Sequence, residues 1–471
     1  MRRLIAVMLL AALFACDDGF LLAPKDGGPD VDPDASVEAT VDAATPVDAT
    51  DGGDAALPAR TRTRTLLDGD VRFYASNELA SAGAPAFDDA AWPIVRWPHT
   101  WNVLGKSTGN VRPFVAYSHA WYRTRFSAEK KGRVYLSFEG VATIADVFVN
   151  GKKLGQHRGA YTRFVFDATD AVVPGGDNVL AIMVSNADAD TRDTLPSNAI
   201  SIGYFRPYGG VYRKAWVLET DAVHVDPTDL GSSGVYLTQT NVGRDAADLR
   251  VTTMLRNDDV APHPMEIEHR LLDREGKVLQ TLATTVTLDA GARGRTDVDA
   301  HVGSPHLWGP KDPYLHRVVT TVSVDGRVRD AVEERLGFRS FRLTDDDFQV
   351  NGTSTLLRGI SKHQETEAHQ SAVTDDELRA DWDLLQELGV NFVRLVHYPH
   401  AQLEYDLADE RGLVLWTENG LTVGAPYSAT GELITREMVK QSYNHPSVAF
   451  FGAGNESAND GDAALIDAVV R

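Results

Sequence analysis

The sequence has 471 residues, of which 43% are hydrophobic, and carries a formal net charge of −21 at pH 7. At roughly 100 to 200 residues per domain, this length predicts about three domains, and the apolar content is enough for several cores. The negative charge argues against nucleic acid or an anionic membrane surface as the main partner, because both would be repelled, and favours a neutral ligand.

The first residues have the pattern of a targeting signal. A basic start, MRR, precedes an apolar stretch, residues 4–14, that is too short for a stable membrane span. The segment LFAC, which ends at Cys16, resembles the lipobox of bacterial lipoproteins, in which the cysteine becomes the lipidated first residue. We therefore expect residues 1–16 to be a lipoprotein signal and the protein to reach the bacterial cell envelope through a lipid anchor. Plain secretion is the alternative, and as the only cysteine Cys16 allows no internal disulfide.

Residues 17–62 are rich in Asp, Ala, Pro and Gly and contain few aromatic residues. Such a segment cannot bury enough apolar surface to offset the entropy of ordering, and its like charges extend it. It is predicted to be a disordered linker, and much of the negative charge of the chain belongs to it.

Residues 63–220 show short alternating strands separated by turn signals, which predicts a β-sandwich. Within them, Asn150-Gly151 is a pair that readily takes the positive φ angles of a type I′ hairpin turn. Residues 221–339 repeat the pattern around an Asp325-Gly326 turn and have the length of one immunoglobulin-like sandwich. We therefore expect two β-domains in succession.

Residues 340–471 change to an apolar period of about 3.6, which indicates helices between strands. One helix begins with a capping box of Thr374 and Glu377 and ends at Gly389. Its apolar face is predicted to contain Leu378, Trp382, Leu385 and Leu388. Strands and helices alternate through about four units, which predicts a parallel sheet and an incomplete eight-stranded β/α barrel.

Polar side chains follow each of the four strands predicted in this last segment. They are His363 after the first strand, His397 and Tyr398 after the second, Glu418 and Asn419 after the third, and Asn455 and Glu456 after the fourth. In a β/α barrel these positions converge on the catalytic face. Any one of them alone could be a helix cap or a satisfied core group, but their coincidence in all four loops favours a functional site.

A series of motifs, in sequence order, resembles glycoside hydrolase family 2, the β-galactosidase and β-glucuronidase group. They include WPHTWN, FEGVATIADVFVNGKKLGQHRGAYTRFVFD, PYGGVYRKAWV, LWGPKDPYLHRV, NGTSTLLRGISKHQ, NFVRLVHYPH, DLADERGLVLWTE and NHPSVAFFGAGNES. The resemblance implies a sugar-binding-like jelly roll at 63–220, an immunoglobulin-like domain at 221–339 and the first half of a catalytic TIM barrel at 340–471. It implies a retaining exo-β-glycosidase, most similar to β-galactosidases, that hydrolyses terminal β-glycosides.

The resemblance also implies roles for individual residues. The Asn-Glu pair after the fourth strand supplies the general acid/base, which falls on Glu456, while Asn455 holds the sugar 2-hydroxyl. Arg394, inside the second strand, matches an arginine near the catalytic carboxylates, and Glu418 matches a supporting acidic position. Three more positions resemble sugar-contacting residues of the family: His363, His397 and Tyr398. The acid role requires a glutamate with a raised pKa and a fixed position.

No cofactor and no catalytic metal are expected. Magnesium-dependent β-galactosidases continue past the third strand with further acidic and histidine ligands, whereas this chain continues as TENGLTVGAPYS. The stretch HQETEAHQ, which begins at His363, holds two histidines and two glutamates. Its spacing fits no compact ligand pair such as His-Glu-x-x-His.

The second catalytic carboxylate is not found in the sequence. Retaining glycosidases need a nucleophile about 5 to 5.5 Å from the acid/base, and the family takes it from the seventh barrel strand. Only Asp460, Asp462 and Asp467 follow Glu456 as acids. The sequence therefore predicts a fragment or truncated frame, inactive alone, that ends about halfway round the barrel. A second chain that carries the other half, and a noncatalytic carbohydrate-binding surface lipoprotein, are the alternatives.

Overall fold

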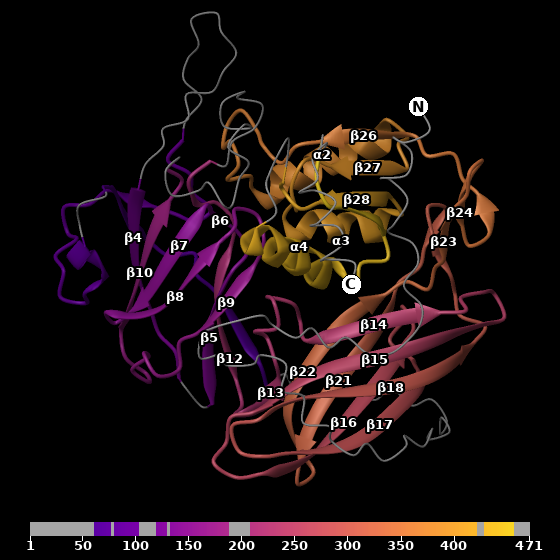
Figure 1. The fold of residues 1–471 in the computed structure, drawn as a ribbon, viewed down its shortest axis with the longest axis horizontal. Helices are drawn as coiled ribbons and strands as arrows, with labels where there is room; N and C mark the ends of the chain where they lie inside the picture. The colour runs from indigo at the N-terminus through magenta and orange to yellow at the C-terminus, as the bar shows by residue number, and fades with distance from the viewer. Residues whose placement is uncertain are drawn as a thin grey trace, which may run out of the picture.

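The computed structural model describes residues 61–76, 80–102, 119–129, 132–187, 208–421 and 428–455. Three folded parts follow one another along the chain (Figure 1). Two β-rich parts come first, and a third part of parallel strands and helices, orange to yellow in Figure 1, lies against both of them.

The first part is a sandwich of antiparallel strands. Its strands are β1 (Thr63–Leu66), β2 (Val71–Ala75), β3 (Ile94–Val95), β4 (His119–Phe126), β5 (Arg133–Phe138), β6 (Val141–Ala142), β7 (Ile144–Val149), β8 (Lys152–Arg158), β9 (Phe164–Asp167), β10 (Asn178–Ser185), β11 (Gly210–Val211) and β12 (Ala215–Thr220), with a 3-10 helix at Ala80–Gly83. One sheet has the order β1-β12-β5-β9 and the other β3-β2-β4-β10-β7-β8, while β6 and β11 pair separately. Apolar side chains of both sheets share one core.

The second part is also a sandwich, with a core of its own. Its strands are β13 (Val223–Val225), β14 (Val235–Thr240), β15 (Ala246–Asn257), β16 (His263–Leu272), β17 (Val278–Leu288), β18 (Arg293–Gly303), β19 (Trp308–Gly309), β20 (Asp312–Pro313), β21 (His316–Val324) and β22 (Arg327–Leu336). Strand β15 pairs with β13, β14 and β18 in one sheet, and the other sheet has the order β17-β16-β21-β22. Strand β18 alternates exposed and buried residues along its length, as expected for a strand with one face on a core.

Both predicted hairpin turns are confirmed by their backbone angles. The φ angles are 49° and 85° at Asn150 and Gly151, and 52° and 69° at Asp325 and Gly326. Positive φ at both central residues is the signature of the tight turns that match the twist of paired strands.

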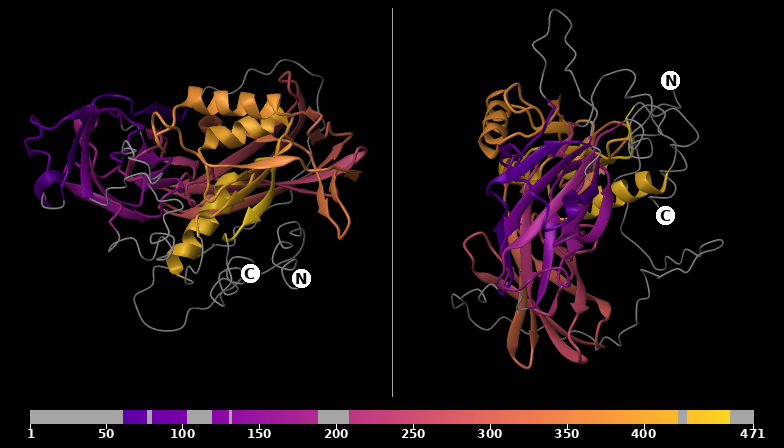
Figure 2. Two further views of the ribbon diagram at one scale, coloured as in Figure 1. Left: turned by 90° about the horizontal axis from the view of Figure 1, so that it is seen from above. Right: turned by 90° about the vertical axis from the view of Figure 1, so that its left-hand side faces the viewer.

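The third part begins with three short antiparallel strands and continues as alternating parallel strands and helices. Its elements are β23 (Phe341–Leu343), β24 (Phe348–Val350), β25 (Thr353–Ser354), β26 (Gly359–Lys362), α2 (Asp375–Glu387), β27 (Phe392–Leu395), α3 (Gln402–Arg411), β28 (Val414–Glu418), α4 (Ala429–Ser442) and β29 (Val448–Gly452). The parallel sheet has the order β26-β27-β28-β29. Helices α2 and α3 share an apolar cluster with β27 and β28, and α4 lies apart from them (Figure 2). Among the described helices none is long and apolar enough to cross a membrane.

Helix α2 confirms the predicted capping box and corrects its apolar face. The Thr374 side chain accepts from the Glu377 amide, and the Glu377 side chain accepts from the Thr374 amide. Three of the four predicted apolar residues are buried, but Leu388 is 70% exposed. The helix ends at Glu387, so Leu388 is its C-cap and no longer follows the helical face.

The amino ends of the parallel strands are closed by apolar side chains. Phe348 and Val350 of β24 form a cluster with Val414 and Ala449, against which Phe392 and Phe450 also pack. In β/α barrels this end contributes to stability, while the carboxyl ends carry the chemistry.

Arg62, which its composition placed in the linker, belongs to the folded protein. Its guanidinium donates to both carboxylate oxygens of Asp330, at 3.1 and 2.6 Å, and to the carbonyl of Val225 at 2.7 Å. Composition alone could not locate this boundary, because the partners of Arg62 lie far along the chain.

Candidate active site

The carboxyl ends of β27, β28 and β29 bring four of the predicted site residues together. Glu418, the last residue of β28, is only 1% exposed. Arg394 of β27 donates from Nε to Glu418 Oε1 at 2.6 Å and from Nη2 to Asn455 Oδ1 at 2.8 Å. His397 Nδ1 lies 3.0 Å from Glu418 Oε2. We call Arg394, His397, Glu418 and Asn455 the Glu418 cluster.

Strand alternation explains why Arg394 and Glu418 meet. Successive side chains of a strand point to opposite faces of the sheet. In β27, Val393 and Leu395 join the apolar cluster with the helices, which leaves Arg394 on the opposite face. In β28, Leu415 joins the same cluster, so Glu418 lies on the face that Arg394 occupies. A buried carboxylate is stable there because a cation pairs with it.

Two neighbours shape the floor of the Glu418 cluster. The guanidinium carbon of Arg394 lies 5.3 Å from the centre of the Trp416 ring, within the range of a cation–π contact. Gly452 is the register partner of Glu418, and a Cβ atom there would come within 2.6 Å of Trp416 Nε1 and 2.7 Å of Glu418 Cγ. Glycine at 452 therefore lets β28 and β29 approach with both side chains in place.

His363 and Tyr398 form a second pair beside this cluster. His363 Nδ1 lies 3.3 Å from the Tyr398 hydroxyl, and the rings of His363 and His397 meet edge to face, 5.4 Å apart. Burial, together with the nearby His400, His397 and Lys362, lowers the pKa of His363 to about 4. At neutral pH His363 is therefore an uncharged imidazole, which suits hydrogen bonding with neutral hydroxyl groups.

Two predicted residues, Glu456 and Cys16, lie outside the described residues. The chain leads to Glu456 through Asn455, whose amide donates to the Leu421 carbonyl at 2.9 Å. Asn455 is thus held through its backbone and, by Arg394, through its side chain.

The stretch that begins at His363 does not gather its histidines. His363 faces Tyr398, whereas His369 pairs with the capping-box residue Glu377, 2.9 Å away. The described residues do contain one group with metal-ligand types, Asp406, Asp409 and His445. Asp406 and Asp409 lie in α3, and His445 lies between α4 and the amino end of β29.

Protein partners already occupy the atoms of that group. His445 Nδ1 lies 2.6 Å from Asp409 Oδ2, and Asp409 Oδ1 accepts from the Ser447 amide at 3.0 Å. Arg335 of β22 pairs with Asp406 at 3.3 Å, so a cation is present already. The Arg335–Asp406 pair joins the third part to the second, and we assign the group a structural role.

The sequence analysis missed one aromatic residue of the first part that contacts the site, Tyr161. Tyr161, in the loop between β8 and β9 of the first part, stacks on Tyr398 with ring centres 4.1 Å apart and an interplanar angle of 7°. Its segment belongs to one of the family motifs, but nothing in a single sequence connects Tyr161 to a loop more than two hundred residues away.

Family models cover most of the chain. The galactose-binding domain-like model of glycosyl hydrolase family 2 matches residues 102–216, the family 2 model matches 233–339, and the family 2 TIM barrel model matches 341–471. The chain belongs to glycoside hydrolase family 2. The resemblance seen in the motifs is confirmed, as is the sequence of galactose-binding-like, immunoglobulin-like and barrel domains.

Relatives of this family 2 chain carry two names. A β-glucuronidase of Bacteroides fragilis is 34% identical over 78% of this chain and 53% of its own length. A β-galactosidase of Thermoanaerobacter pseudethanolicus is 28% identical over 83% of this chain and 51% of its own length. The crystal structure of a Bacteroides uniformis β-glucuronidase superposes with a TM-score of 0.79 at 29% identity, over 87% of this chain and 50% of that one. The chain spans about half the length of these relatives.

Proposed function

We propose that this protein acts as a retaining exo-β-glycosidase, of the β-galactosidase type, with Glu456 as general acid/base. The observation that carries the proposal is the Glu418 cluster, a fixed polar network at the carboxyl ends of parallel strands in a family 2 chain. Such strand ends form the catalytic face of a barrel.

Asn455 is the proposed partner of a sugar hydroxyl. Because Arg394 donates to Asn455 Oδ1, the amide nitrogen of Asn455 is turned away from the arginine. That nitrogen carries two hydrogens, which suits donation to a sugar hydroxyl. The same contact fixes the chain one residue before Glu456, and an acid catalyst must be fixed in position to protonate a leaving oxygen.

The proposed preference for a galactoside over a glucuronide rests on charge. A glucuronide carries a carboxylate, which needs a cation in the pocket. Among the described residues at the strand ends, Arg394 is engaged by Glu418 and Asn455, and Lys362 is engaged by Asp381 and Glu404. A neutral sugar makes no such demand, and the uncharged His363 suits it.

The test is hydrolysis of aryl β-galactosides and aryl β-glucuronides, by this chain and by any longer product of the same gene. In the product that hydrolyses these substrates we expect a preference for the galactoside, and in that product Glu456→Gln should lower kcat/KM by about 10²- to 10⁴-fold for substrates with poor leaving groups. Asp460→Asn, a nearby acid, is the matched control. An unchanged kcat/KM in Glu456→Gln would refute the acid/base assignment. Preferred hydrolysis of the glucuronide would refute the choice of sugar.

We also propose lipidation at Cys16, because a lone cysteine closes the apolar signal segment. Mass spectrometry of the mature protein from a bacterial host tests it. A lipid-modified cysteine at the new N-terminus is expected, and an unmodified peptide that begins elsewhere would show plain secretion instead.

A further inference from the structure

One arginine of the first domain contacts the loops after two barrel strands. Arg213, between β11 and β12, is 3% exposed. Its Nη1 donates to the Tyr161 carbonyl at 2.7 Å, and its Nη2 donates to Gln364 Oε1 and to the Pro399 carbonyl, both at 2.7 Å. Gln364 directly follows His363, and Pro399 directly follows Tyr398. A single buried guanidinium therefore spans the carboxyl ends of β26 and β27.

The two loops are also tied to each other at this point. The Gln364 side-chain oxygen accepts a second hydrogen bond, from the Ala401 amide at 2.8 Å. Ala401 is the residue before α3. Arg213 thus holds a side chain that bridges the loop after β26 and the loop after β27.

Tyr161 reaches the same loop and the next one. Besides its stacking on Tyr398, it borders Gly420, which lies two residues after Glu418. A Cβ atom at Gly420 would come within 3.2 Å of the Tyr161 ring and 3.7 Å of Tyr398 Cβ, and its φ of +90° favours glycine. The loops after β27 and β28 therefore close on one aromatic ring from the first domain.

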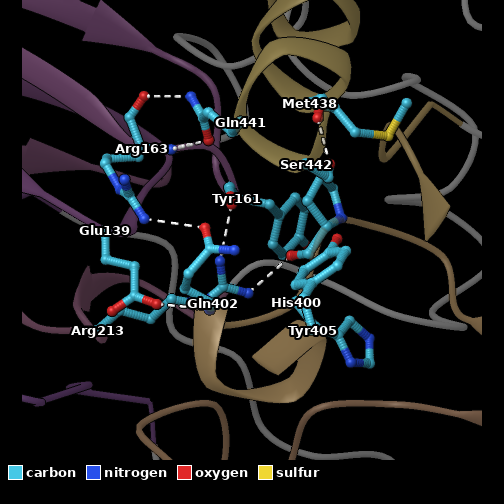
Figure 3. Close-up of a pocket in the computed structure, with 11 residues that line it drawn as sticks. Glu139, Tyr161, Arg163, Arg213, His400, Gln402, Tyr405, Met438, Gln441 and Ser442 are labelled. Carbon is cyan, nitrogen blue, oxygen red and sulfur yellow. Dashed lines mark hydrogen bonds between the residues drawn. The ribbon is translucent and has the colours of Figure 1, made fainter. Parts of the chain in front are cut away.

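Further hydrogen bonds lie around Arg213 and Tyr161, across the interface between the first domain and the barrel domain. We call this interface the joint. The Gln402 amide donates to Glu139 at 2.7 Å, and Arg163 donates to the Gln402 side chain at 2.9 Å. Figure 3 shows Arg163 bonded to Gln402 of α3 and to Gln441 of α4. Buried hydrogen bonds are lost when their geometry changes, so this joint specifies a position as well as providing contact area.

We propose that Arg213 and Tyr161 are positioning residues, through which the galactose-binding-like domain sets the placement of His363 and Tyr398 at the strand ends. A binding site needs its side chains held within about 0.5 Å, and loops at strand ends need a second layer of contacts to achieve this. The sugar-contacting role of His363 and Tyr398 rests on the proposed function, but their placement can be measured without turnover.

The matched control is the neighbouring residue. Lys214 also crosses the joint, with Nζ 2.5 Å from Asp375 at the start of α2, but its side chain is 33% exposed and its ion pair is with the helix. If Arg213 acts by position, Arg213→Met should disturb the loops after β26 and β27, and Lys214→Met should not.

The readout is the titration of His363 by NMR of histidine-labelled protein, with the signal assigned from a His363→Gln sample. In Arg213→Met the apparent pKa of His363 should rise from about 4 toward the ordinary value by at least about one unit, because a loosened loop admits water. Amide exchange of residues 397, 398, 400 and 401 should increase about tenfold or more. Arg213→Lys, which keeps the charge but not the fork of donors, should rescue only part of the effect.

A second pair of variants keeps the proposal testable if Arg213→Met fails to fold. Tyr161→Phe retains the ring that stacks on Tyr398 and should behave as wild type, whereas Tyr161→Leu should raise the pKa of His363. If folded Arg213→Met and Tyr161→Leu leave the titration and the exchange unchanged, or if Lys214→Met changes them equally, the proposal is wrong. If the titration and the exchange change as expected but hydrolysis does not, the positioning role stands and the sugar-contacting role of His363 and Tyr398 in the proposed function is contradicted.

Discussion

Two buried glutamates of the barrel domain have matching partners and different surroundings. In the Glu418 cluster, a carboxylate meets one cation and one histidine. Glu404 of α3 does the same: Lys362 Nζ lies 3.2 Å from Glu404 Oε2, and His400 Nδ1 lies 3.1 Å from Glu404 Oε1. Glu404 and Glu418 are 0% and 1% exposed. Residue types alone do not separate the two sets.

Access to solvent separates them. The side chains of Arg394 and His397 are 28% and 20% exposed, whereas those of Lys362 and His400 are 8% and 0% exposed. Trp382 of α2 also donates its indole N–H to Glu404 at 2.9 Å, from the helix side of the sheet. The Glu418 cluster, the open set, lies where a ligand can reach it. Glu404, Lys362 and His400 form the sealed set, which lies behind it. A charged cluster therefore indicates function through its position relative to the strand ends.

The electrostatics of the sealed set agree with a structural role. Burial by itself would raise the pKa of Glu404, but Lys362 and then His400 lower it to about 2. Burial lowers the pKa of His400, so the histidine stays neutral while Glu404 and Lys362 form the ion pair. Nothing in this set changes its protonation near neutral pH.

The largest expected effect comes from breaking the sealed pair. Lys362→Met leaves the Glu404 charge buried without its cation, and should lower the free energy of unfolding by about 3–5 kcal/mol. Urea unfolding measures it. The double variant Lys362→Met/Glu404→Leu, which removes both charges, should recover most of this loss. A loss below about 1 kcal/mol in the single variant would show that water reaches the pair after all.

A change in the open set should lower hydrolysis much more than it lowers stability. Arg394→Lys keeps the charge but cannot hold Glu418 and Asn455 with one planar fork. Because water reaches this set, we expect a stability loss of no more than about 1.5 kcal/mol. Hydrolysis of the proposed substrate should fall by about 100-fold, since Asn455 is no longer oriented. Lys362→Arg is the matched control, and an equal loss of hydrolysis there would remove the distinction between the two sets.

The open set was predictable from sequence because its causes are local. A parallel sheet places the ends of neighbouring strands together, so His397, Glu418 and Asn455 could be grouped without knowing any side-chain contact. Arg394 lies inside its strand, and only the family resemblance assigned it to the same site. Strand alternation then decides which face they share. The failure at Leu388 is local too, since the exact last residue of a helix depends on how its end is capped.

The second layer of the site was not predictable. Arg213 and Gln364 are 151 positions apart, and Arg163 and Gln402 are 239 positions apart. No periodicity or capping rule connects such pairs, because they meet only when two separately folded domains dock. The sealed set is a related case, since HYPHAQLE offers two histidines and one acid without indicating that His397 faces the site while His400 faces Glu404.

The smallest expected effect compares two histidines, one in each environment. His363 has a pKa of about 4 in the folded protein and an ordinary value near 6.5 in the unfolded chain. Between these pH values the unfolded chain binds more protons than the folded protein does. The contribution of His363 to the free energy of unfolding is therefore fully present above pH 6.5 and is lost as the pH falls toward 4. His363→Gln should flatten stability in this window and change little above it. Other buried histidines titrate in the same range, so the difference between wild type and variant is the quantity to measure.

His400→Gln sharpens the contrast, because it acts on the sealed set. His400 Nδ1 contacts Glu404 and its Nε2 contacts the Val396 carbonyl, 3.2 Å away, and both contacts are buried. Removing them should lower the free energy of unfolding by about 1–3 kcal/mol above pH 6.5. This loss should shrink as the pH falls below 6.5, because the variant no longer carries an imidazole that the unfolded chain protonates more readily than the folded protein. Urea unfolding of both variants from pH 4 to 8 decides the matter. If His363→Gln shows the same loss at pH 8 as His400→Gln, the two environments do not differ in the way that their exposure indicates.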